Sequence, residues 1–410
     1  MNLEYFISKR LITTKSYKSS ISSPIIKIAI TAIAIGIIMM IVSVATGIGL
    51  QNKIREKVAA FNGHVIISNY DNNQSEVTKE PISIKQNFYP KFKNISGISH
   101  IQATASKAGI IHTEETFEGI IFKGAGKDYN FKNLKEYLVE GKMPNLKSDL
   151  NEEVLISQYI AKRLNLKLGD KFKTYFLKES GNKPNLRVFK IVGIYNSGFQ
   201  EFDASYIIGD IRHVQKINKW KDDQIGAFEV FIDDFTQIKQ KGEEIYKEIP
   251  PTYNSTTIEE KYYSIFEWLK LFDFNIVIIL IVMIIVATIN MIVALLVLIL
   301  ERTQMIGILK ALGANNWNIR KIFLYNASYL IIRGLLIGNA IAIGLLLIQK
   351  YFGLIKLNPE NYYVDVAPVD INPIHIIVLN LGTILICFLV LLIPSYIITK
   401  ISPVKAIRFD

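Results

Sequence analysis

Side chains that could catalyse a reaction are few in this sequence, and none of them has the spacing that a known chemistry requires. The histidines form neither an HExxH motif nor another metal-binding pattern; they are His64, His100, His112, His213 and His375. No Gly-x-Ser-x-Gly nucleophile motif occurs. The phosphate-loop lookalike Gly124-Ala-Gly-Lys127 lacks the first glycine of that motif and is followed by Asp128, where a Mg²⁺-binding hydroxyl is needed. We therefore predict that the chain is not an enzyme and binds neither a metal nor a cofactor.

The stretch 301–321 has the pattern of a short helix that a partner can hold. Its apolar residues recur at i, i+3, i+4 and i+7; they are Met305, Ile308, Leu309 and Leu312. Arg302 and Lys310 lie beside this stripe, and Gly313 is a natural stop. A solvated loop with one helical turn is the alternative.

Long apolar runs on both sides of this stretch predict a membrane protein. Half of the 410 residues are hydrophobic. Ile28–Leu50 is a run of 23 residues without a charge and Phe274–Leu300 is a run of 27, and each can cross about 30 Å of hydrocarbon as a helix. Two further runs follow later in the chain. We predict four transmembrane helices, at residues 28–50, 273–300, 322–349 and 374–399.

The basic residues predict the orientation of these helices. Lys and Arg are in excess in the leader 1–27, in the stretch 301–321 and in the tail 400–410, whereas the loop 350–373 has more acids than bases. Because basic flanks resist translocation, we expect both termini and the stretch 301–321 to be cytoplasmic, with residues 51–272 outside. The net charge of +11 then fits anionic lipid, and we expect no nucleic-acid partner.

Residues 51–272 read as a large α/β domain of two subdomains, so the fold class is an α+β membrane protein. Runs rich in β-branched and aromatic residues predict strands at 65–68, 108–112, 119–123, 171–177, 188–195 and 228–232. Two helices are also predicted here, at 51–62, stopped by Asn62-Gly63, and at 157–164, capped by Ser157. Cys387, the sole cysteine, lies in the fourth span, so no disulfide can form within the chain.

Three smaller features concern the membrane. Leu3, Phe6, Ile7 and Arg10 suggest an amphipathic leader helix on the inner leaflet. Arg333, inside the third span, is expected to lean toward the N-terminal end of its helix. The glycines that follow it allow close helix packing, either within one chain or across a dimer; they are Gly334, Gly338 and Gly344.

The amino-acid sequence of the central stretch resembles a segment of a known family. Ile306-Gly-Ile-Leu-Lys-Ala-Leu-Gly-Ala314 is similar to the coupling helix of ABC permeases of the FtsX-like superfamily, which includes lipoprotein-releasing (Lol) permeases, MacB-type exporters and FtsX division proteins. In that family the helix binds a separate ATPase. The resemblance implies that the ATPase contacts here are Arg302, Met305, Ile308, Leu309, Lys310 and Leu312. Met305 departs from the family, which usually has an acid there.

Other segments resemble the lipoprotein-releasing branch more than the MacB branch. They are Glu153–Ser157, Ala161–Leu164, Leu168–Asp170, Phe189–Asp203 and the loop Asn358–Val369. The tail Ser402–Arg408 matches in part, with Lys405 and Ile407 as departures. The match covers nearly the whole chain and places it in the bacterial inner membrane.

The resemblance also implies partners. These are a cytoplasmic ABC ATPase that binds ATP and Mg²⁺, a second permease subunit, identical or related, a lipoprotein cargo and a periplasmic carrier. In Lol permeases a hairpin hooks the carrier, which points to 178–187 and to Pro184, Leu186 and Arg187; an ordinary solvated loop is the alternative. Lol relatives hold acyl chains between the first and second spans. That implies a cargo cavity lined by Val44, Ile48, Phe266, Leu269, Phe272 and Asp273.

Simpler explanations exist for part of this cavity. The residues around Asp273 are also what an ordinary interfacial anchor carries. Asn290, which matches a polar residue of the family in the second span, is expected to pack against a neighbouring helix rather than cargo.

The function expected from the resemblance is release of lipoproteins from the inner membrane and their transfer to the carrier. Two alternatives remain. One is MacB-type export of small amphiphiles or peptides, and the other is an FtsX-like regulator that transmits ATPase motion to a cell-wall hydrolase.

Overall fold

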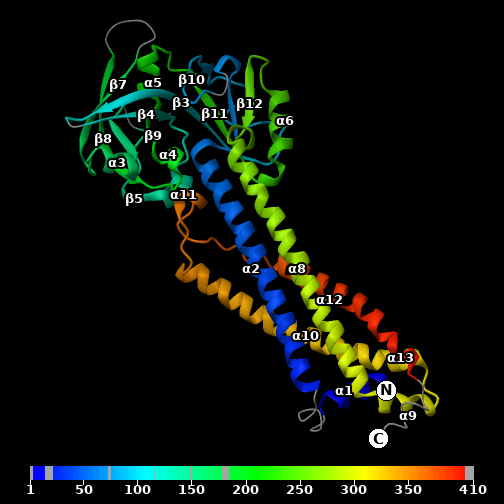
Figure 1. The fold of residues 1–410 in the computed structure, drawn as a ribbon. Coiled ribbons are helices and arrows are strands. Elements are labelled where there is room, and N and C mark those ends of the chain that lie inside the picture. The colour runs from blue at the N-terminus through cyan, green and yellow to red at the C-terminus, as the bar shows by residue number, and fades with distance from the viewer. Residues whose placement is uncertain are drawn as a thin grey trace. The chain divides into compact units, whose positions relative to one another are not determined.

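The computed structural model describes residues 3–13, 22–72, 75–114, 116–147, 150–177 and 184–401. The chain divides into two compact units (Figure 1). The membrane unit comprises Met1–Leu50, Leu269–Ile355 and Val366–Asp410, and the α/β unit comprises Gln51–Trp268 and Lys356–Asp365. Each unit has its own hydrophobic core.

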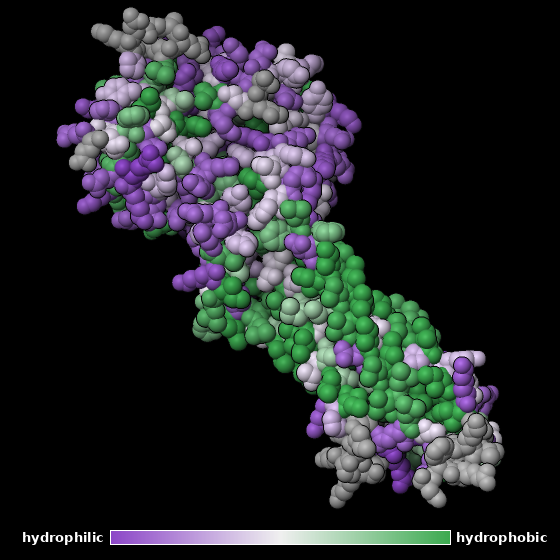
Figure 2. Space-filling model, in the orientation of Figure 1, coloured by the Kyte–Doolittle hydropathy of each residue, from purple (hydrophilic) through white to green (hydrophobic). Residues whose placement is uncertain are grey.

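Four helices in the described residues are long and apolar enough to span a membrane. They are α2 (Ser22–Asn62), α8 (Tyr263–Glu301), α10 (Asn316–Phe352) and α12 (Pro373–Ser395), the last followed by the short α13 (Ile397–Lys400). The predicted number of spans is therefore confirmed. The helix predicted at 51–62 is the continuation of α2, and it ends at Gly63, whose φ is +69°. On the face seen in Figure 2, hydrophobic residues make up most of the surface of the membrane unit.

Glycines bring α2 close to two other spans within the chain. A Cβ added at Gly334 of α10 would lie 2.7 Å from Ile33 Cγ2 of α2, and one at Gly338 would collide with Ile37. Gly47 of α2 meets Ile276 of α8 in the same way, at 2.5 Å. Small residues therefore permit backbone approach inside one chain, which decides between the two alternatives for Gly334 and Gly338. Among the described residues, no other helix comes within 4 Å of a Cβ added at Gly344.

The leader forms helix α1 (Leu3–Thr13), as predicted. This helix packs against the membrane unit itself, and not only against a lipid surface. Tyr5 packs edge-on against Tyr325 of α10, with ring centroids 5.9 Å apart, and Ile7 packs against the core of the membrane unit. Arg333 lies with its guanidinium 4.4 Å from the ring centroid of Tyr329, toward the N-terminal end of α10, as predicted.

A ten-stranded sheet organises the α/β unit, and its order is β12-β1-β11-β3-β4-β9-β6-β8-β5. The strand bounds are β1 (Val65–Asn69), β3 (Ile98–His112), β4 (Phe117–Ala125), β5 (Leu138–Gly141), β6 (Glu153–Ser157), β7 (Lys171–Phe176), β8 (Asn185–Tyr195), β9 (Tyr206–Asp210), β11 (Ala227–Ile232) and β12 (Tyr253–Thr257). β7 pairs with both β3 and β8. The strands β3, β4, β9, β6, β8 and β7 therefore close a ring. β2 (Ile82–Ser83) and β10 (Gln224–Ile225) form a separate pair.

Aromatic side chains fill the interior of this ring. Phe122 of β4 stacks on Phe189 of β8 with centroids 4.8 Å apart, and Phe176 of β7 meets Phe122 edge-on. His213 of α5 (Ile211–Asn218) packs against both stacked rings. All six predicted strands are present, whereas β5, β6, β9 and β12 of this sheet and the short pair β2 and β10 were not predicted as strands. The two expected subdomains share one sheet, because the long β3 pairs with β11 through its first half and with β4 through its second.

Helices complete the α/β unit. α3 (Gln158–Arg163) has the predicted Ser157 cap, whose Oγ accepts a hydrogen bond from the Ile160 N–H at 3.0 Å. The remaining helices are α4 (Gln200–Asp203), α6 (Ile238–Glu248), α7 (Ile258–Lys261) and α11 (Pro359–Tyr362).

Candidate functional site

The predicted short helix of the central stretch is α9 (Thr303–Ala311), which joins α8 to α10. Gly313, with φ +87°, ends it, and the Asn315 side chain then caps α10. Ile306 is fully buried, and Met305 and Leu309 pack against the core of the membrane unit. The helix is therefore held on its own chain by one apolar side.

The other side of α9 leaves a small apolar surface exposed. Ile308 is 47% exposed and Leu312 is 80% exposed. Trp317, at the start of α10, is 47% exposed and was not singled out from the sequence. We call Ile308, Leu312 and Trp317 the α9 corner. Exposed large side chains at a helix end are suited to bind a partner protein.

The two basic residues expected to contact an ATPase have partners within the chain. Arg302 lies 3.7 Å from the carboxylate of Glu301. Lys310 Nζ donates hydrogen bonds to the backbone carbonyls of Ile398 and Ile401, each at 2.7 Å. The ammonium of Lys310 thus points at α13, which the sequence pattern could not reveal.

The residues of the predicted carrier hairpin lie on two different faces. Residues 178–183 are outside the described part of the chain, and Pro184 is exposed. The strand register places Leu186 opposite Tyr175 and Tyr175 opposite Ile110, on the outer surface of the ring. Arg187 falls on the inner face of β8 with the buried Phe189, because side chains alternate along a strand. The carrier contact of Pro184, Leu186 and Arg187 stays a prediction, with Leu186 and Arg187 on opposite faces of β8.

Leu186 belongs instead to an apolar patch on the outside of the ring. We call it the ring patch, and its exposed members are Ile110, Phe117, Leu177 and Leu186. Tyr175, half-buried, lies among them, and His112 meets it edge-on. Leu177 directly precedes residues 178–183 in the sequence, so the patch contains a described residue next to the predicted carrier hairpin.

The residues predicted to line a cargo cavity are dispersed. Val44 is buried and lines a small pocket with residues of α10 and α12. Ile48 and Phe272 are half-buried, Leu269 is fully buried and Asp273 is exposed. Phe266 is buried and stacks on the half-buried Phe235 of the α/β unit, with ring centroids 5.8 Å apart. Gly47 of α2 and Ile276 of α8 approach each other closely, and the cargo cavity stays a prediction.

Asn290 bonds within its own helix rather than to a neighbour. Its Nδ2 donates to the Val286 carbonyl at 2.8 Å. The amide pair that does join two spans is Asn339 of α10 and Asn380 of α12, which donate to each other at 2.7 and 2.9 Å. Two isolated Asn residues, 41 positions apart, gave no sequence signal that they would meet.

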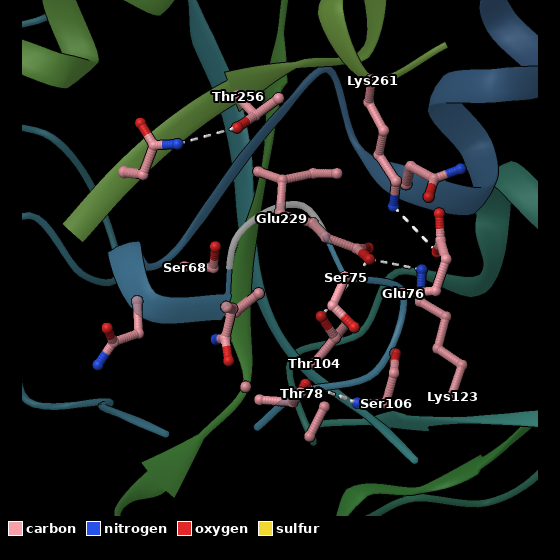
Figure 3. A pocket seen from close by; sticks show the side chains of 18 of the residues that line it. Ser68, Ser75, Glu76, Thr78, Thr104, Ser106, Lys123, Glu229, Thr256 and Lys261 are labelled. Carbon is pink, nitrogen blue, oxygen red and sulfur yellow. Dashed lines mark hydrogen bonds and ion pairs between the residues drawn. The ribbon is translucent and has the colours of Figure 1, made fainter. Parts of the chain in front are cut away.

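A polar pocket in the α/β unit was not predicted at all (Figure 3). At its floor Lys123 and Glu229, both buried, form an ion pair of 2.5 Å, and Gln102 donates to Glu229 at 2.8 Å. Lys123 Nζ also donates to the carbonyl of Phe61, in the last turn of α2. Burial lowers the pKa of Lys123, and the charge of Glu229 partly offsets that effect.

The pocket also holds the segment that leads into α8. Lys261, at the end of α7, forms an ion pair of 3.1 Å with Glu76. The hydroxyl of Tyr262 donates to Asn62 Oδ1 at 3.0 Å. Burial raises the pKa of Tyr262 well above its ordinary value, so the phenol remains a donor. These contacts fix the end of α2 and the segment before α8 to the same part of the sheet.

A third chain segment is anchored in the α/β unit through Lys57 of α2. Its Nζ donates to the Tyr363 carbonyl at 2.7 Å, and the Tyr363 ring stacks on Phe199 at 4.5 Å. Burial lowers the pKa of Lys57 to about 8, with the nearby Asp365 acting in the opposite direction. The segment 356–365, which lies between the third and fourth spans in sequence, is thereby held by α2.

Nothing in the described residues has the arrangement of a metal centre, since no three His, Cys, Asp or Glu side chains gather in one place there. The features found there are exposed apolar surfaces and points at which chain segments are attached. Together with four apolar helices and an α/β unit inserted after the first, they define a membrane protein of the permease class.

Comparison with known families is consistent with this class. The model of the MacB-like periplasmic core domain matches residues 28–245, and that of the FtsX-like permease C-terminal domain matches residues 277–403. The chain belongs to the family of FtsX-like permeases with a MacB-like periplasmic core domain.

Similar individual proteins include subunits of lipoprotein-releasing systems. The transmembrane protein LolC of Buchnera aphidicola subsp. Schizaphis graminum is 25% identical over 401 residues, which cover 94% of each chain. LolE of Haemophilus influenzae is 21% identical over 421 residues, or 99% of each chain. Among solved structures, the periplasmic region of MacB from Actinobacillus actinomycetemcomitans is 17% identical, with a TM-score of 0.34, and the alignment covers 49% of this chain and 91% of that one.

Proposed function

We propose that this chain is the permease subunit of an ABC transporter that extracts lipoproteins from the inner membrane and passes them to a periplasmic carrier. The observation that carries the proposal is similarity to LolC and LolE over 94% and 99% of the chain. A relative that matched only the spans or only the α/β unit would not support a shared function in this way.

Hydrolysis is assigned to a separate cytoplasmic ATPase that binds ATP and Mg²⁺. The α9 corner supports this assignment, because Ile308, Leu312 and Trp317 are large apolar residues that are 47%, 80% and 47% exposed. This proposal places α9 and both termini in the cytoplasm and the α/β unit in the periplasm. The basic flanks of the spans support that orientation.

A second permease subunit is also proposed. In α8 only 11% of the most apolar stretch is buried, compared with 50% in α2. Its exposed residues include Phe274, Val277, Ile281, Ile285 and Ile289. A lipid-binding cavity would then form between two subunits, with Phe272 at its edge, rather than between α2 and α8 of one chain.

A photocrosslinking experiment tests the cargo. A photoreactive amino acid at Phe272, in cells that contain the complete transporter, should capture a lipid-modified protein, and that capture should decrease when ATP is supplied to isolated membranes. The same group at Phe388, which is exposed on α12, is the control and should capture lipid alone. Equal capture at both positions would contradict the cargo assignment.

MacB-type export of a small amphiphile is the second candidate, because the MacB-like core domain model matches 28–245. Recovery of only small soluble molecules at Phe272 would favour it.

A further inference from the structure

The fourth span is broken at the end that lies next to α9. Pro394 lies in the last turn of α12, and a new short helix, α13, begins at Ile397. The Tyr396 N–H donates to Ile393 at 3.1 Å rather than to Leu392. Helix ends leave carbonyls without partners in the helix. The break therefore creates two sets of acceptors, one at the end of α12 and one at the end of α13.

Two basic residues, one on α9 and one on α10, donate hydrogen bonds to these carbonyls. Lys310 of α9 donates to the carbonyls of Ile398, Thr399 and Ile401 at 2.7, 3.3 and 2.7 Å. Arg320 of α10 donates through Nη2 to the Leu392 carbonyl at 3.0 Å and through Nε to Ser395 Oγ at 3.1 Å. Hydrogen bonds from charged donors are among the stronger ones, and a cation at a helix C-terminus is favourable.

The positions of these residues set this contact apart from an ordinary helix cap. Lys310 follows the exposed Ile308 and precedes the exposed Leu312, and the Arg320 guanidinium lies 5.3 Å from the ring centroid of the exposed Trp317. Each basic residue is thus close in sequence to a member of the α9 corner, and its side chain ends on the fourth span. Ile306 of α9 and Ile398 of α13 are also fully buried in one core.

Covalent connections alone would link α9 to only two spans. It follows α8 directly, and the turn 312–315 leads into α10. We infer that Lys310 and Arg320 are positioning residues that lock the broken end of the fourth span to α9, so that a partner moving the α9 corner moves three spans as one body. This inference rests on the proposed function, because it assigns the route by which ATPase motion reaches the membrane.

The test compares a double variant, Lys310→Met with Arg320→Met, with two controls in the reconstituted transporter. Lys321→Met removes one charge beside Arg320 without touching these bonds. Lys310→Arg with Arg320→Lys keeps both cations. Three quantities are measured: ATPase co-purification, ATP hydrolysed per lipoprotein released, and the distance between spin labels at Gln304→Cys and Lys400→Cys in a Cys387→Ala background, with and without nucleotide.

We expect the double Met variant to retain the ATPase and to hydrolyse ATP, but to require about tenfold more ATP per lipoprotein released, a typical size for coupling between sites. The distribution of distances between the two spin labels should remain narrow in wild type in every nucleotide state and become broad in the double Met variant. Lys321→Met should behave as wild type, and the cation-preserving variant should recover most of the coupling.

The outcomes separate this inference from the proposed function. The locking role would be overturned if the double Met variant used as much ATP per lipoprotein as wild type and kept a narrow distribution of label distances. Loss of ATPase binding in that variant would also overturn it, because the two residues would then be needed for docking. A third outcome is that wild type releases no lipoprotein while the distance distribution still broadens only in the double Met variant. The locking role of Lys310 and Arg320 would then stand, and the proposed function would fail.

Discussion

At the scale of single residues, buried charges in the α/β unit serve to attach chain segments. Lys123 illustrates this, because its ammonium contacts Glu229 on β11 and the Phe61 carbonyl at the end of α2. Moving two charges out of water is costly, so such a pair adds little net stability on its own. Its effect is to fix where α2 ends on the sheet.

We predict that Lys123→Met strongly destabilises the α/β unit. The buried carboxylate of Glu229 would lose its counter-ion, and breaking a buried pair costs about 3–5 kcal/mol. The double variant Lys123→Met, Glu229→Gln should recover most of that loss, since an amide at position 229 can still accept from Gln102. Amide hydrogen exchange in β4 and β11 of the full-length protein measures the free energy of opening.

The surface pair Lys85–Asp223, at 3.2 Å and with Lys85 largely exposed, offers a matched control. Lys85→Met should change the free energy of opening by less than about 1 kcal/mol. A Lys123→Met effect no larger than this would contradict the attachment role of the buried pair.

At the scale of elements, α9 carries apolar side chains both on its buried side and on its exposed side. One side, with Ile306 and parts of Met305 and Leu309, is buried in the membrane unit, whereas the other exposes Ile308 and Leu312. The two sides should therefore respond differently to the same substitution.

Leu312→Asp is predicted to abolish co-purification of the ATPase while the protein still inserts and folds, because position 312 contributes nothing to the core. Leu309→Asp, by contrast, places a charge in a partly buried site and should lower the yield of folded protein as well. Affinity purification from solubilised membranes measures the first effect, and size-exclusion chromatography measures the second. Normal ATPase recovery with Leu312→Asp would mean that the α9 corner is not the docking site.

At the scale of the whole molecule, the α/β unit holds three parts of the chain that lead to or from spans. They are the end of α2, the segment 261–262 before α8 and the segment 356–365. The ring formed by β3, β4, β9, β6, β8 and β7 presents the ring patch on its outer surface. We expect the attachments to serve coupling to the membrane and the ring patch to serve the carrier.

Deletion of residues 178–183 should leave folding and ATPase activity near normal, because β7 and β8 still pair from Lys171 to Phe176. Lipoproteins should then remain in the inner membrane, because the carrier is no longer recruited. Leu186→Asp, on the ring patch, should act in the same direction, whereas Arg187→Asp, on the other face of β8, should act through stability instead. Fractionation of inner and outer membranes measures sorting, and normal sorting in the deletion strain would refute the carrier contact.

Much of the architecture could be read from local pattern. Apolar length determined the four spans, since a helix in hydrocarbon must satisfy its own backbone and be long enough to cross. The Asn62-Gly63 stop, the Ser157 cap and the strands at 65–68 and 188–195 were also predictable, because caps and alternation act between neighbours in sequence.

What only the tertiary structure decided are contacts between residues far apart in sequence. The closure of the ring by β7, the pairing of Asn339 with Asn380 and the reach of Lys310 to α13 depend on how elements pack. The sequence showed Lys310 beside an apolar stripe and could not show which side of the helix would be covered. Periodicity determines which residues share a face, but the neighbour that covers that face is chosen by packing across the whole chain.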